Sequence, residues 1–253
     1  MEPISGGTII LYGILASTIA GLATGIGAFP SLFVRSVSDR FMDSSLGFAA
    51  GVMLAATSFS LIVPAIEAGG IWITVIGIAV GAVFLDRADK WIPHEHFLKG
   101  PEGPSSTLRR TWLFILAITL HNFPEGLAVG VGFGGGDVAG GTALAIGIGL
   151  QNMPEGLAVA LPLLREKYSR GKALLIATAS GLVEPIGGLI GVGAVTLARP
   201  FLPLGLAFAA GAMLFVISDE IIPETHSRGN EREATFGVII GFLVMMTLDN
   251  LFG

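Results

Sequence analysis

The chain has 253 residues, of which 52% are hydrophobic and only 13% are charged, and its mean hydropathy is +0.78. Soluble domains carry about 25% charged residues, so this composition excludes an ordinary globular domain and favours a polytopic membrane protein. Cysteine is absent, which excludes disulfides and thiolate metal ligands. The net charge of −5 averages over two aqueous faces and indicates no nucleic-acid partner.

Apolar stretches of about twenty residues, each long enough to cross roughly 30 Å of hydrocarbon, occur eight times along the chain. The predicted spans cover residues 8–34, 44–66, 71–89, 111–133, 139–163, 173–197, 203–222 and 234–252. The first apolar run has no basic segment before it and is too long for a signal peptide, so we expect it to be the first span. Residues 1–253 are therefore predicted to form a single transmembrane domain, embedded in a lipid bilayer.

The basic residues predict the orientation of these spans. All but one of the 14 Lys and Arg residues fall in the connections after spans one, three, five and seven, and the exception is Arg199. The positive-inside rule places those connections in the cytoplasm and both termini outside. The longest connection, residues 90–110, is rich in Gly, Pro and Ser and is predicted to be a flexible cytoplasmic loop. Its His94, Glu95 and His96 are candidate metal ligands, although a solvated polar loop is the favoured alternative.

Two pairs of related phrases indicate an internal repeat. His121–Val129 reads HNFPEGLAV and Gln151–Val159 reads QNMPEGLAV, while Phe48–Leu54 and Phe208–Leu214 share the pattern FAAGxML. In the predicted topology the two members of each pair run in opposite directions across the membrane. Related segments of opposite direction are typical of transporters built from inverted repeats, whose binding sites lie near the midplane.

Three carboxylates lie near the middle of three predicted spans, at about the same depth: Glu125, Glu155 and Glu184. Each would cost roughly 3 kcal/mol facing lipid, and no Lys or Arg lies in these spans to pair with them. A multivalent cation, protons or water must neutralise them. His121 lies one helical turn from Glu125, and Gln151 lies one turn from Glu155, so two polar faces can converge. Imidazole, carboxylate and amide ligands suit divalent first-row metals and discriminate poorly among zinc, manganese and iron.

Prolines accompany all three carboxylates. Pro124 and Pro154 each precede a glutamate, and Glu184 precedes Pro185. A proline inside a helix removes a hydrogen bond and kinks the helix, so we expect opened backbone that lines a cavity at this depth.

At these residues the sequence resembles the ZIP (Zrt/Irt-like protein) family of divalent-metal transporters, of bacterial type. The resemblance covers essentially the whole chain and implies an all-α protein of eight transmembrane helices with inverted repeats in a 3+2+3 arrangement. It also implies a binuclear metal site between the fourth, fifth and sixth spans. The main position would use His121, Glu125, Gln151, Glu155 and Glu184. The neighbouring position would use Asn122 and Asn152, with Glu125 and Glu155 as bridges. Some bacterial members carry an acid where this chain has Asn152, and the loss of that charge bears on how tightly the second position is occupied.

Other polar residues are candidate steps along a transport route, although a polar helix end in the headgroups is an equally weighted alternative for each. The entrance candidates are Met53, Ser60 and Asp249. The exit candidates are Asp43, Asp219, Glu220 and His226. The resemblance further implies alternating access, in which spans one, four, five and six slide as one bundle.

The function predicted from these features is transport of divalent metal cations, zinc foremost and also Cd²⁺, Fe²⁺, Mn²⁺ or Co²⁺, toward the cytoplasm across the inner membrane. No catalytic residue or catalytic cofactor is expected. One alternative is an intramembrane metalloenzyme, but the chain has no H-E-x-x-H and only His121 lies at midplane depth. Another is a proton- or sodium-coupled carrier of an organic solute, for which only Phe123 and Phe133 offer aromatic contacts. The oligomeric state stays open, with a homodimer as one alternative.

Overall fold

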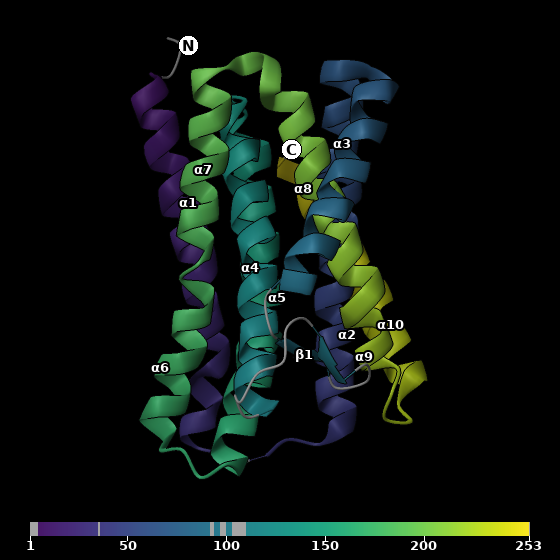
Figure 1. Cartoon of the computed structure of the whole chain (residues 1–253). Helices are drawn as coiled ribbons and strands as arrows, with labels where there is room; N and C mark the ends of the chain where they lie inside the picture. The colour runs from purple at the N-terminus through teal and green to yellow at the C-terminus, as the bar shows by residue number, and fades with distance from the viewer. Residues whose placement is uncertain (1–4, 35, 92–93, 97–99, 103–109, 253) are drawn as a thin grey trace.

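The fold is known from a computed structural model that describes residues 5–34, 36–91, 94–96, 100–102 and 110–252, and it is an elongated bundle of helices (Figure 1). The α-helices are α1 (Gly6–Ala28), α2 (Asp39–Ala55), α3 (Val63–Trp91), α4 (Arg110–Gly134), α5 (Val138–Arg165), α6 (Arg170–Gly181), α7 (Glu184–Leu197), α8 (Leu202–Val216), α9 (Ile222–Thr225) and α10 (Glu231–Phe252). Short 3-10 segments cover Phe29–Leu32 and Arg199–Phe201, and π-helical segments cover Ala56–Ile62 and Ile217–Ile221.

The prediction of a helical membrane protein is confirmed. Within the described residues, six helical stretches are long and apolar enough to cross a membrane. They are Gly6–Leu32, Asp39–Ala88, Val138–Arg165, Arg170–Leu197, Arg199–Thr225 and Glu231–Phe252. The stretch Asp39–Ala88 contains two of the predicted spans, and it is interrupted at Gly70, whose φ of 78° and ψ of 168° are not helical. A positive φ of this kind is readily adopted only by glycine, so the chain changes direction there.

The ends of the helices follow local sequence signals. Ser5, Ser38, Asp137 and Ser169 precede α1, α2, α5 and α6, and each side chain accepts a hydrogen bond from the backbone N–H three residues later. Such N-caps satisfy a backbone donor that the first helical turn leaves free. The connections α1–α2, α5–α6 and α9–α10 lie at one end of the bundle, whereas the N-terminus and the α7–α8 connection lie at the other (Figure 1).

The loop predicted for residues 90–110 contains a small antiparallel hairpin of β1 (His94–His96) and β2 (Gly100–Glu102). The side chains of both strands, and residues 92–93, 97–99 and 103–109 as a whole, are outside the described part of the chain. The predicted mobility of this loop and its metal ligands His94, Glu95 and His96 therefore stay predictions.

The helices pack in two groups. In the first group, α1, α4, α5, α6 and α7 pack against one another; in the second, α2 packs on α10 and α3 packs on α8. Glycines allow the closest approaches in the second group. A Cβ atom on Gly51 would collide with the backbone of Val238 on α10, and one on Gly81 would collide with the backbone of Phe208 on α8. Small residues that bring helix backbones together are typical of packing within a bilayer.

The packing also repeats itself between the two halves of the chain. The pairing of α2 with α10 corresponds to that of α8 with α3, and the pairing of α1 with α5 corresponds to that of α7 with α4. Each repeated phrase FAAGxML is followed by a π-helical segment, Ala56–Ile62 after the first and Ile217–Ile221 after the second. These correspondences are those expected of an inverted repeat, and they extend it beyond the two pairs of phrases that the sequence pattern identified.

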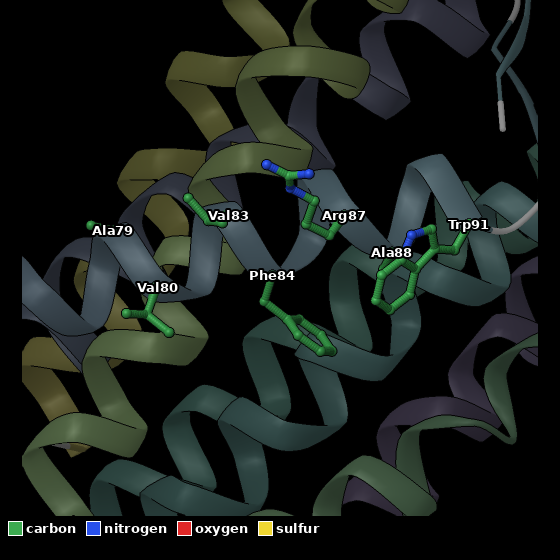
Figure 2. A pocket seen from close by; sticks show the side chains of 7 residues that line it. All are labelled: Ala79, Val80, Val83, Phe84, Arg87, Ala88 and Trp91. Carbon is green, nitrogen blue, oxygen red and sulfur yellow. The ribbon is translucent and has the colours of Figure 1, made fainter.

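The outer surface of the bundle is apolar. Trp72 and Trp91, near the two ends of the outward-facing stretch of α3, are 76% and 77% exposed. An open groove of about 600 Å³ runs along this helix from Ala79 to Trp91, shown in Figure 2. Its lining residues are Ala79, Val80, Val83, Phe84, Arg87, Ala88 and Trp91. An apolar exterior around a polar interior is the arrangement that a surrounding bilayer favours.

Candidate metal centre

The two repeated phrases meet in the interior of the bundle. α4 carries His121 and Glu125, α5 carries Gln151 and Glu155, and Glu184 is the first residue of α7. Glu125, Gln151 and Glu184 are completely buried, Glu155 is 3% exposed and His121 is 4% exposed. All five predicted ligands of the main position therefore lie in the protein interior, away from the lipid-facing surface.

Amide side chains connect the carboxylates. Gln151 Nε2 donates to Glu125 Oε1 at 2.5 Å, which links α5 to α4. Asn152 Nδ2 donates to Glu184 Oε1 at 2.6 Å and to the carbonyl of Ala20 at 2.8 Å, which links α5 to α7 and α1. These bonds join four helices, α1, α4, α5 and α7, at the depth of the carboxylates.

Many oxygen atoms at this depth have no hydrogen-bond partner among the described residues. They are Asn122 Oδ1, Glu125 Oε2, Gln151 Oε1, Asn152 Oδ1, Glu184 Oε2 and both carboxylate oxygens of Glu155. A buried polar atom left unsatisfied costs about 1–3 kcal/mol, more when it is charged. Within the described part of the chain, no three His, Asp or Glu side chains are grouped closely enough to hold a metal ion as they stand. The interior thus brings together several unsatisfied oxygen atoms that can bind a metal ion, but they do not form a complete coordination shell as they stand.

A contact between the two helix groups involves one of the predicted metal ligands, His121. His121 Nε2 on α4 lies 2.7 Å from Glu220 Oε1, which belongs to the π-helical segment Ile217–Ile221. Both side chains are buried. We predicted Glu220 as a separate step on the exit route, whereas the structure places it directly beside a predicted ligand. π-Helical turns frequently occur at functional sites, and this one turns an acid inward.

The model of the ZIP zinc transporter family matches residues 93–249 of this chain. The chain belongs to the ZIP family. It is similar to zinc transporter ZIPB of Bordetella bronchiseptica, with 44% identity covering 96% of this chain and 82% of that protein. It is also similar to zinc transporter GufA of Myxococcus xanthus, with 45% identity covering 95% and 99%. Human zinc transporter ZIP11 is 36% identical, covering 97% and 98%.

Membership of the ZIP family confirms the predicted resemblance and the prediction of a transporter in place of an enzyme. Family membership and the helices of membrane-spanning length together confirm that this ZIP protein is a multi-pass membrane protein.

The predicted entrance residues of this ZIP protein lie in the second helix group. Ser60 Oγ donates to Asp249 Oδ1 at 2.5 Å, joining the π-helical segment after α2 to α10. Met53, one to two turns earlier, is buried. Their part in a transport route stays a prediction.

Of the predicted exit residues, Asp43 and His226 contact the connection between α9 and α10, whereas Glu220 lies beside His121. Asp43 is completely buried, and its two oxygens accept hydrogen bonds from Arg228 Nη1 and Asn230 Nδ2, each at 2.9 Å. His226 Nε2 lies 3.0 Å from Thr235 Oγ1, and Asp219 is half-buried beside Glu220. Asp43 of this ZIP protein is therefore already paired with a basic side chain.

Of the three proline-bearing segments at which we predicted opened backbone, one has an interrupted helix. α4 continues through Pro124 and α5 continues through Pro154. In contrast, α6 ends at Gly181 and α7 begins at Glu184, so Glu184 stands at a helix start. Pro124 and Pro154 each precede a glutamate within a continuous helix, whereas Pro185 directly follows Glu184, and only this third segment is interrupted.

Proposed function

We propose that this ZIP protein carries divalent metal cations, zinc foremost, across the inner membrane toward the cytoplasm. The relatives named as zinc transporters support zinc, and Cd²⁺, Fe²⁺, Mn²⁺ and Co²⁺ are further candidates because the ligand types are similar for all of them. The observation that carries the proposal is the concentration of unsatisfied buried oxygens from Asn122, Glu125, Gln151, Asn152, Glu155 and Glu184.

The membrane topology of the proposal has eight spans with both termini outside. The non-helical Gly70 supports division of Asp39–Ala88 into two spans, and α4, with 25 residues, is long enough to be another. The clustering of basic residues in connections that lie at one end of the bundle supports a cytoplasmic position for that end (Figure 1).

In the proposed binuclear site, Glu125 and Glu155 bridge two metal positions. The main position adds His121, Gln151 and Glu184, and the second adds the amide oxygens of Asn122 and Asn152. An arriving dication would exchange its water ligands for these oxygens. Since Gln151 and Asn152 already donate to Glu125 and Glu184, their amide groups need only rotate to present oxygen instead of nitrogen.

Alternating access in this proposal moves one helix group against the other. The predicted moving bundle of spans one, four, five and six corresponds to α1, α4, α5 and α6–α7, which pack against one another. The contact of His121 with Glu220 crosses between the groups and would have to break during such a movement. Protonation of Glu125, Glu155 or His121 from the inner face would weaken metal binding and favour release. Release that is independent of internal pH and of these residues would contradict this coupling.

The test is metal flux into liposomes that contain the purified protein, measured for several metals with and without a pH gradient. We expect Glu125→Ala and Glu155→Ala to lower zinc flux at least about tenfold, since loss of a metal ligand or its supporting partner has effects of this size or larger. Glu67→Ala is the matched control, because Glu67 is exposed on α3 away from the site. Wild-type liposomes without metal uptake would contradict the proposed function.

A further inference from the structure

Thr24 on α1 has a buried hydroxyl group that lacks a partner. The side chain is completely buried, and its Oγ1 has no hydrogen bond to any described residue. Hydroxyls in membrane helices ordinarily bond back to the carbonyl four residues earlier, as Thr18 does to Ile14 at 2.6 Å and Thr119 does to Ile115 at 2.7 Å. The corresponding carbonyl for Thr24, that of Ala20, instead accepts the amide of Asn152.

The sequence around Thr24 matches the sequence around Glu184. Ala20–Gly27 reads AGLATGIG and Ser180–Gly187 reads SGLVEPIG, so that Gly21, Leu22, Ile26 and Gly27 align with identical residues. In this alignment Thr24 takes the place of Glu184. The repeat thus relates α1 to the α6–α7 pair, which the phrases in α4 and α5 alone did not indicate.

Two hydrogen bonds follow the same alignment. Asn152 Nδ2 donates to the carbonyl of Ala20 at 2.8 Å, and Asn122 Nδ2 donates to the carbonyl of Ser180 at 2.9 Å. Each acceptor is four residues before the aligned position, Thr24 in one half and Glu184 in the other. The asparagine of each repeated phrase therefore donates a hydrogen bond to the equivalent backbone carbonyl of its partner helix.

Glycine contacts show the same relation at the aligned residues themselves. A Cβ atom on Gly156 would collide with the carbonyl of Thr24, and one on Gly126 would collide with the carbonyl of Glu184. Thr24 is consequently placed against α5 as Glu184 is placed against α4. Glu184 reaches across to accept a hydrogen bond from Asn152 of the opposite phrase. By the symmetry of the repeat, the residue equivalent to Asn152 for Thr24 is Asn122, whose Oδ1 is also unsatisfied.

Thr24 also lies at the interruption between α6 and α7. A Cβ atom on Gly181, the last residue of α6, would come within 2.6 Å of Thr24 Oγ1. The hydroxyl is thus close to the helix break that ends in Glu184, and it has no hydrogen-bond partner among the described residues.

We propose that Thr24 contributes its hydroxyl oxygen to the second metal position, opposite Glu184, as a neutral counterpart of that carboxylate. This inference rests on the proposed function. With Thr24, the second position has only oxygen ligands, which come from Asn122, Asn152 and the shared carboxylates. The main position also has the imidazole of His121. All-oxygen sites suit harder ions such as Mn²⁺, and imidazole suits zinc. A hydroxyl where the repeat has a carboxylate keeps the second position weaker than the first.

The test measures metal binding by titration calorimetry on the full-length protein in detergent, with zinc and manganese separately. We expect wild type and Thr24→Ser to bind two ions per chain. Thr24→Val, of equal volume but without the hydroxyl, should lower affinity for the weaker ion at least tenfold and leave the tighter ion unchanged. Thr24→Asp should raise the affinity for the weaker ion. Thr18→Val is the matched control on the same helix, because its hydroxyl already bonds to Ile14.

Thermal unfolding separates a ligand role from a purely structural one. Without metal, Thr24→Val should unfold at the same or a higher temperature than wild type, because it removes an unsatisfied hydroxyl. The additional rise in unfolding temperature on adding metal should be smaller than in wild type. If Thr24→Val does not fold, Thr24→Asp provides the test. An affinity of Thr24→Asp for the weaker ion that is equal to or lower than that of wild type overturns the inference.

Equal affinity of Thr24→Val and wild type for the weaker ion, or a single bound ion in wild type, also overturns the inference. A single bound ion would also contradict the proposed binuclear site, but neither result contradicts the proposed zinc transport as long as wild-type liposomes take up zinc. Absence of zinc uptake by wild type, in contrast, is the failure of the proposed function itself.

Discussion

The two halves of the candidate metal centre have the same backbone arrangement but different side chains at equivalent places. In the half formed by α4 and α7, the side chains are His121, Asn122, Glu125 and Glu184. In the half formed by α5 and α1, the side chains at equivalent places are Gln151, Asn152, Glu155 and Thr24. The asparagines and glutamates are common to both halves, and the bonds from Asn122 and Asn152 to the partner helices are equivalent. We therefore propose that the shared residues build the site and that the unshared ones decide which ion it prefers.

The largest expected effect concerns the shared carboxylates. Glu125→Gln and Glu155→Gln should each lower zinc flux about 100-fold, because both carboxylates are proposed to bridge the two ions. The double variant should be less than tenfold worse than either, since residues that act as one unit are not additive. Flux assays in liposomes check this, and an effect confined to one of the two glutamates would show that the halves contribute unequally.

A smaller effect is expected from making the two halves alike at their first position. His121→Gln gives α4 the amide that α5 already has in Gln151. Zinc flux should fall about tenfold while manganese flux changes much less, because only the softer ion benefits from imidazole. The control is Glu67→Gln, because Glu67 is exposed on α3 away from the centre. Parallel loss of both metals would mean that His121 has no part in selection.

The smallest effect is expected at the contact between the helix groups. Glu220→Gln keeps the size of the side chain but removes its charge beside His121, and we expect the maximal rate to change only two- to fivefold. Calorimetric affinity for the tighter zinc ion should remain that of wild type. A changed affinity together with an unchanged rate would place Glu220 among the ligands instead of at the contact between the groups.

The sequence was sufficient for the positions of the helices. α5 was expected at 139–163 and covers Val138–Arg165, and the turn expected between residues 66 and 71 is the break at Gly70. Long apolar runs bounded by Gly, Pro and Ser specify such limits locally. Burial of Glu125, Glu155 and Glu184 was also predictable, because unpaired acids in apolar helices turn away from lipid.

What the sequence did not reveal are contacts between distant segments. The approach of Glu220 to His121 depends on how the two helix groups pack, and the extra residue of a π-helical turn shifts the facing of Glu220. Thr24 was overlooked although AGLATGIG and SGLVEPIG are similar, because the substitution of a hydroxyl for a carboxylate hides their equivalence. A search for repeats that allows such exchanges would have found it.

The equivalent asparagine bonds of the repeat have an evolutionary consequence. Both bonds end on main-chain carbonyls, which any residue supplies, so an ancestor with two identical halves would have satisfied them equally well. Such an ancestor needed neither the imidazole nor the third acid to assemble. The side chains proposed as ligands can consequently diverge after duplication without disturbing the architecture, and we expect members with new ion preferences to arise by a few exchanges at these unshared positions.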